Sequence, residues 1–138
     1  MSDPAAQGSL GERIEAIESG YEYLLAYAAQ GRATDEGSST RDRLAAMLVA
    51  LKGLADVVRP EFAAAQAVSG FLDALERDAG VAAGAIALVL ARHPIPSALI
   101  DNLNASIHLR ALLTDLFLID QALKTSPRSS SDSRSSGP

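Results

Sequence analysis

The stretch "IEAIESGYEYLLAYAAQG", from Ile14 to Gly31, decides the fold expected for this chain. It contains all three tyrosines of a sequence that has three phenylalanines and no tryptophan. Apolar side chains recur here in steps of four and three, which is the spacing of one apolar stripe on an α-helix. The stripe consists of Leu10, Ile14, Ile17, Tyr21, Leu24 and Ala28. It predicts a helix over residues 10–29 that ends at Gly31, with Tyr21 facing the core.

The same helix carries a second apolar face. Successive residues are rotated by about 100°, so Tyr23 and Tyr27 lie far from the stripe, with Ala16 and Gly20 beside them. Glu15, Glu18 and Glu22 form an acidic flank between the two faces. A second apolar face needs a second packing partner, either another helix of this chain or another molecule, and tyrosine is common at protein interfaces. We therefore predict an interface at Ala16, Gly20, Tyr23 and Tyr27, with packing inside the chain as the alternative.

The rest of the chain also favours helices, because alanine and leucine dominate and strict alternation is rare. Four further helices are expected, over residues 40–58, 60–78, 81–92 and 97–124. The predicted fold is an all-α, single-domain, up-and-down bundle of about five helices. A flexible lead over residues 1–9 precedes the bundle over residues 10–125. The serine-rich segment 126–138 is predicted to be a disordered tail.

The longest uncharged run is "AGVAAGAIALVLA", Ala79 to Ala91. Its thirteen residues are too few to span a bilayer, which takes about twenty, so a buried helix is expected. Gly80 and Gly84 are four residues apart and would allow another backbone to approach closely.

The last expected helix also has surplus apolar residues. Its stripe is Leu109, Leu112, Leu116, Ile119 and Leu123, whereas Phe117 and Leu118 lie well away from it. Surplus apolar faces on two helices favour self-association. We therefore add Phe117 and Leu118 to the predicted interface and expect a homodimer.

Polar residues follow one stripe of that helix: Ser97, Asp101, Asn104, His108 and Asp115. A carboxylate and an imidazole on one face would serve as an acid–base pair or hold a polar ligand. The candidate ligand-binding residues are Asp101, Asn104, His108 and Asp115. Tyr23 and Tyr27 would lie with Asp101 and His108 near a small-molecule pocket. The alternative is a stripe that is simply exposed to water.

Composition and motifs limit the partners, cellular location and kinds of site that are expected. The chain has 138 residues, no cysteine and a net charge of −5, and an acidic protein repels phosphate backbones and anionic lipids. Nucleic-acid and membrane partners are therefore not expected. No signal peptide is visible, so a cytoplasmic location is expected. Phosphate-loop, zinc-protease, di-iron and serine-nucleophile motifs are absent, and neither a metal nor a cofactor is expected.

The sequence therefore favours a non-catalytic protein that works through protein–protein contacts, with a protein partner or itself, in an accessory, adaptor or regulatory role. The alternative is a small-molecule-binding bundle or a small enzyme.

Overall fold

The computed structural model describes residues 8–125 and is all-α, as predicted. No β-strand occurs in that range, and none of its helices is both long and apolar enough to cross a bilayer. The helices are α1 (Leu10–Ala29), α2 (Thr40–Leu51), α3 (Leu54–Val58), α4 (Ser69–Leu90), α5 (Ser97–Ala105) and α6 (Ile107–Thr125), with 3₁₀ turns η2 (Arg59–Phe62) and η3 (Gln66–Val68) between α3 and α4.

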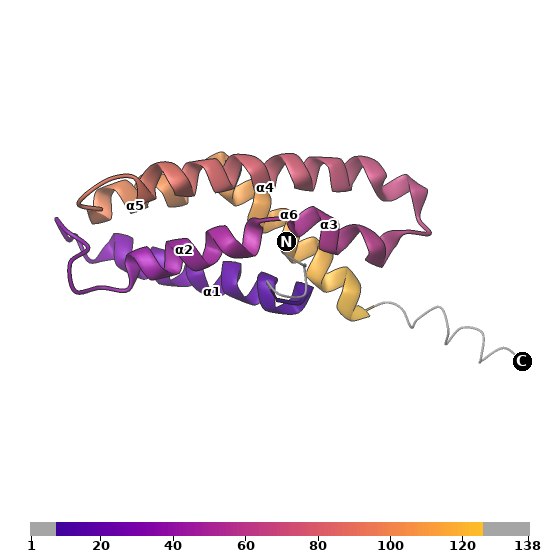
Figure 1. Cartoon of the computed structure of the whole chain (residues 1–138), viewed down its shortest axis with the longest axis horizontal. Helices are drawn as coiled ribbons and strands as arrows, with labels where there is room; N and C mark the ends of the chain where they lie inside the picture. Colours follow the sequence, from indigo (N-terminus) through magenta and orange to yellow (C-terminus); the bar gives the residue numbers. More distant parts are fainter. Residues whose placement is uncertain (1–7, 126–138) are drawn as a thin grey trace, which may run out of the picture.

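The helices form an elongated bundle in which successive long helices run in opposite directions (Figure 1). The chain passes along α1, returns through α2 and α3, and comes back along α4 on the opposite side of the molecule. The main packing pairs are α1 with α2 and α5, and α4 with α2 and α6. Their buried apolar side chains form one core cluster that draws on all six α-helices.

Local sequence signals set both ends of α1. The Ser9 hydroxyl accepts a hydrogen bond from the Glu12 backbone N–H, and the Glu12 carboxylate accepts one from the Ser9 N–H, which forms a capping box. Gly31, with φ +65°, adopts the left-handed conformation favoured just after a helix. Ser9, the last residue of the predicted lead, is the N-cap residue of α1. Residues 1–7 of the lead and the predicted tail 126–138 lie outside the described part.

Three predicted helix boundaries are wrong. The helix expected over residues 40–58 is interrupted after Leu51, because Lys52 is extended and Gly53 has φ +70°. The break expected near Gly80 does not occur, since buried Leu75, Ala79 and Ala82 continue one apolar stripe along α4. Pro60, expected to begin a helix, instead lies in η2.

A fourth wrong boundary concerns the helix expected over residues 97–124. It divides at Ser106, whose backbone is extended with ψ 130°. The Ser106 hydroxyl then accepts hydrogen bonds from the His108 and Leu109 backbone N–H groups at the start of α6. This serine ends α5 and begins α6, so residues on the two helices do not share one continuous stripe.

Candidate functional site

The C-terminal half of α4 has an uncharged exposed surface. The helix buries Leu72, Leu75, Ala79, Ala82, Ile86 and Val89. The opposite side exposes the charged Asp73 and Arg77 in the first half of α4 and then, from residue 80 onward, a second set: Gly80, Val81, Gly84, Ala87, Leu88 and Ala91. We call this second set the α4 outer face. Leu88 is 67% exposed and Val81 43%. The helix expected to be buried over this run is therefore buried on one side only, and its other side faces away from the core.

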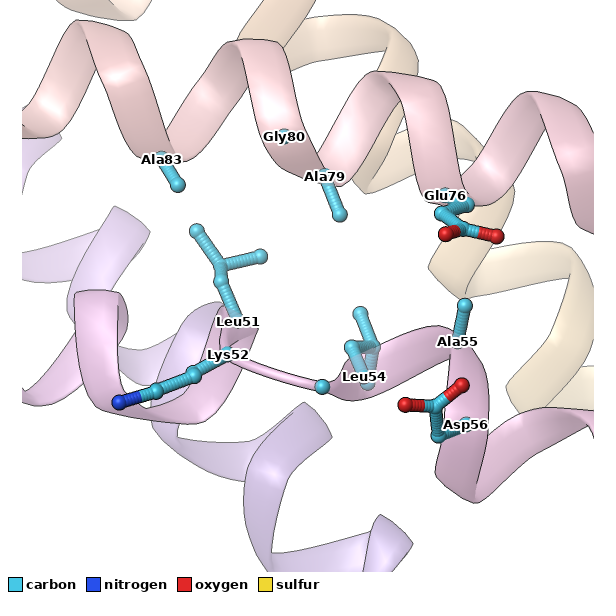
Figure 2. Close-up of a pocket in the computed structure, with 10 residues that line it drawn as sticks. Leu51, Lys52, Leu54, Ala55, Asp56, Glu76, Ala79, Gly80 and Ala83 are labelled. Carbon is cyan, nitrogen blue, oxygen red and sulfur yellow. The ribbon is translucent and has the colours of Figure 1, made fainter.

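A groove separates α4 from the junction of α2 and α3, with a volume of about 370 Å³. Leu51 and Leu54 rise from the junction towards Ala83 and Ala79 on α4, whereas the Lys52 ammonium points away (Figure 2). The lining is thus mostly apolar along its length. Glu76, at the far end, is already engaged by Arg59 at 2.9 Å. This groove offers space for an apolar side chain and few polar groups that converge on a ligand.

A second groove lies between α4 and α5 and has a volume of about 210 Å³. Its apolar lining comes from Ala85, Leu88 and Val89 on α4 and from Leu99 and Leu103 on α5, and Asn102 and Ser106 are its polar members. The α4 outer face is therefore a ridge with an apolar groove on each side. Such a surface suits the packing of another helix, in which side chains enter grooves.

The tyrosine face of α1 packs largely inside the chain. Tyr27 is 1% exposed; burial raises its pKa, and its hydroxyl donates to the Ile95 carbonyl at 2.6 Å. A Cβ on Gly20 would lie 2.6 Å from Met47 Cγ, so glycine at this position allows α2 to pack closely against α1. For Gly20 and Tyr27, the second packing partner is therefore another part of the same chain.

Tyr23 and Ala16 are half-buried. The Tyr23 ring stacks on Tyr27 with centroids 6.4 Å apart, and its hydroxyl accepts a hydrogen bond from the Ser39 N–H at 3.0 Å. The guanidinium of Arg43 lies 5.1 Å from the Tyr23 ring centroid. Tyr23 thus holds the loop between α1 and α2, and part of its ring is covered by a cation.

The end of the bundle beside these tyrosines is held by a polar network. Ser97 donates through its hydroxyl to the Tyr27 carbonyl at 2.7 Å and accepts from the Arg32 N–H at 2.8 Å. The Asp35 carboxylate accepts from the Ile95 N–H at 2.8 Å and from Arg41 Nε at 2.9 Å. These bonds, led by the one from Ile95, lower the pKa of Asp35. The network joins the α1–α2 loop to the α4–α5 loop.

Phe117 and Leu118 are exposed on α6, at 53% and 59%. Thr114 and Gln121, both exposed, flank Phe117 one turn away on either side. These two apolar residues therefore interrupt a polar surface, in contrast to the α4 outer face.

The structure brings together only two of the four predicted ligand residues. Asp101 and Asn104 line a groove of about 390 Å³ between α1 and α5, together with Leu25, Ala28, Ala29, Gly31, Ser97 and Ala98. Asn104 is 7% exposed. Its amide donates to the Leu24 carbonyl at 3.1 Å, and its buried Oδ1 accepts from no donor within residues 8–125.

The other two ligand residues lie elsewhere. His108 is exposed in the first turn of α6 and takes no part in the hydrogen bonds and ring contacts of Tyr23 and Tyr27. Asp115 is paired with Asp78 of α4. The predicted pocket of tyrosines, histidine and aspartates is not assembled, because the break at Ser106 separates its members. No group of three His, Asp or Glu side chains within residues 8–125 is placed to hold a metal ion.

Comparisons of the chain with protein-family models, curated proteins and solved structures found no match.

The sequence contained a usable signal for the α4 outer face. Gly80, Gly84 and Leu88 recur at intervals of four within the uncharged run, which places them on one side of a helix. Because the run carries no charge on any side, its sequence alone does not distinguish the exposed side from the buried one.

Proposed function

We propose that this protein is a non-catalytic protein-binding module with an accessory, adaptor or regulatory role, and that the α4 outer face is its binding surface. One observation carries the proposal: an exposed helix face with no charge from Ala79 to Ala91, on which Leu88 is 67% exposed. A contiguous exposed apolar surface is typical of protein–protein interaction sites. The absence of charge agrees with the depletion of charged residues at interface cores.

The contrast with α6 supports the choice of face. Leu88 has exposed Gly84 and Ala91 one turn away, with Arg92 beyond the end of α4, whereas Phe117 has Thr114 on one side and Gln121 on the other. An apolar partner would therefore bury polar side chains on both sides of Phe117 but none on the Gly84 side of Leu88, and burying polar groups without new hydrogen bonds costs free energy.

Capture from the native cell tests the proposal. The full chain would be compared with Leu88→Glu and, as a matched control, Phe117→Glu, with bound proteins identified after chemical cross-linking. We expect at least one protein, another copy of the chain included, to cross-link to wild type and Phe117→Glu through α4 and to be lost with Leu88→Glu. A cross-link pattern that Leu88→Glu leaves unchanged would overturn the proposal. The expected cytoplasmic location stays a prediction, which microscopy of the tagged chain tests.

Small-molecule binding is retained as a second candidate because the buried Oδ1 of Asn104, beside the α1–α5 groove, accepts from no donor in the described part of the chain. The Asp101 carboxylate at the same groove would favour a ligand with an amino group. A screen of small primary amines by thermal shift, repeated with Asp101→Asn, tests this candidate. A rise in melting temperature that Asp101→Asn abolishes would support it, and no rise at millimolar amine would remove it.

A further inference from the structure

Two glycines on the α4 outer face are not required for packing within residues 8–125. Apart from its chain neighbours and the backbone of its own helix, a Cβ added at Gly80 or Gly84 would meet no atom of that range within 4 Å. Gly20, by contrast, is required by Met47 of the same chain. A glycine in a helix interior destabilises the helix relative to alanine. The space that Gly80 and Gly84 leave is on the outside of the folded chain, where only another molecule can use it.

The same face has both projecting side chains and a groove to receive them. Leu88 projects at the edge of the α4–α5 groove, whose floor is formed by Ala85, Val89, Leu99 and Leu103. Gly84 lies one turn before Leu88 on the same side of α4. A symmetric pair needs a surface that is complementary to itself, so that residue i meets j while j meets i. A ridge with Leu88 next to the gap above Gly84 meets this requirement.

Charge favours a second copy on this face over other faces. The chain has a net charge of −5, so two copies repel each other in most orientations. The side formed by α1 and α6 is acidic: burial, and then the carboxylates of Asp120 and Glu15, raise the pKa of Glu18. The α4 outer face carries no charge over thirteen residues, so a contact between copies within this run contains no carboxylate.

We propose that the occupant of the α4 outer face is the same face of a second copy, with the two α4 helices antiparallel. Leu88 of each copy then lies over Gly84 of the other, at the edge of its α4–α5 groove. The proposal rests on the proposed function, because it names the partner of that binding surface. It also places the self-association expected from the sequence on α4, instead of on α1 or α6.

Light scattering of the full chain from about 1 to about 300 µM tests the proposal. We expect twice the chain mass for wild type and for Phe117→Glu at the upper concentrations. Leu88→Glu should raise the dissociation constant by at least about tenfold, since it places a charge at the centre of the contact. Leu88 is mostly exposed, and circular dichroism verifies that the variant is folded. A wild type with the chain mass throughout, or a dimer that Leu88→Glu leaves intact, overturns the proposal.

Mixing two variants separates a second copy from other partners. Leu88→Lys and Leu88→Glu should each have the chain mass alone, and their mixture should recover the double mass because the introduced charges are opposite and close together. A mixture that stays at the chain mass contradicts the symmetric arrangement.

Failure of the second-copy proposal can be distinguished from failure of the proposed function. If wild type is monomeric but a different protein cross-links to α4 in a Leu88-dependent manner, the second-copy proposal is wrong and the proposed function holds. If neither occurs, both are wrong.

Discussion

The carboxyl groups of Asp78 on α4 and Asp115 on α6 are paired at the contact between these helices. Asp115 Oδ2 is buried, and no N–H or O–H donor of a neutral or basic group within residues 8–125 reaches it. Two ionised carboxylates cannot hydrogen-bond to each other, so the pair is bonded only when it holds a proton. Burial, followed by hydrogen bonding and repulsion from Asp78, raises the pKa of Asp115 to about 7.

The chain should be less stable at about pH 8.5 than at about pH 5. Because the pKa of Asp115 is raised in the folded state, its contribution to stability is complete below its ordinary pKa of 3.8 and is lost as the pH rises through about 7. After discounting for solvent screening of a partly exposed pair, we expect a loss of about 1–2 kcal/mol. The pKa of Asp35 is lowered, so its contribution to stability is lost as the pH falls. This opposite effect occurs only at lower pH.

Thermal unfolding of Asp115→Asn tests this assignment. An amide stays neutral and can donate to Asp78, so the melting temperature should become nearly independent of pH between about 5 and 8.5. Asp101→Asn, at an exposed carboxylate on α5, is the matched control and should keep the wild-type pH dependence. If the dependence persists in Asp115→Asn, the pair is not its source.

Loss of the Tyr27 hydroxyl should destabilise the fold. Tyr27→Phe leaves the Ile95 carbonyl without its 2.6 Å donor, at a cost of about 1–2 kcal/mol. Tyr27→Ala also removes a buried ring and should cost about 3–5 kcal/mol. Tyr21→Phe, at a half-buried position of the same helix, should change stability by less than about 0.5 kcal/mol. Urea unfolding measures all three, and equal effects of the two Tyr-to-Phe changes would contradict the assigned hydrogen bond.

Local signals predicted the class of fold and the bounds of α1 correctly. The apolar repeat sets the course of α1, and the left-handed glycine at residue 31 marks its end. Both signals depend only on residues within one or two helical turns. The breaks at Gly53 and Ser106 were missed because the apolar pattern continues across both positions. At Ser106, a hydroxyl that caps the next helix competes successfully with helix continuation.

The position of the candidate site depended on which neighbour covers each helix face. Angles around α1 separate Tyr27 from Tyr21, but they do not show which loop lies over Tyr27. The loop containing Ile95, some seventy residues along the chain, covers it. For α4, an uncharged sequence does not distinguish a buried side from an exposed one, because every residue in the run tolerates burial.

Arg13 should be among the polar residues most sensitive to substitution. Its side chain is 1% exposed, and it donates to the Gly8 and Ala50 carbonyls at 3.2 Å and to the Lys52 carbonyl at the end of α2. Burial lowers its pKa. Arg13→Met leaves these carbonyls without their guanidinium donor and should cost about 2–4 kcal/mol.

Two further variants sharpen this test. Arg13→Lys keeps a charge but loses the planar fork of donors, and it should also destabilise the fold. Arg110→Met, at an exposed arginine on α6, should have little effect. If Arg13→Met unfolds at the wild-type urea midpoint, the guanidinium does not hold the end of α2.

Alanine substitutions should have opposite effects at two kinds of helical glycine. At Gly84 an added Cβ meets open space, so Gly84→Ala should stabilise the dissociated chain by about 0.5–1 kcal/mol. At Gly20 the Cβ would lie 2.6 Å from Met47 Cγ and 2.7 Å from its Sδ. Gly20→Ala should therefore destabilise the chain by about 1–3 kcal/mol through overpacking.

Urea unfolding at a few micromolar, where a weak dimer is dissociated, isolates these effects. The sign of each change is informative because both substitutions improve intrinsic helix propensity equally. A gain at both positions would mean that α2 moves away from α1 at little cost, so that Gly20 is not needed for their contact. A loss at Gly84 would mean that something within the chain already occupies the space above it, and the α4 outer face would then be unavailable to a second copy.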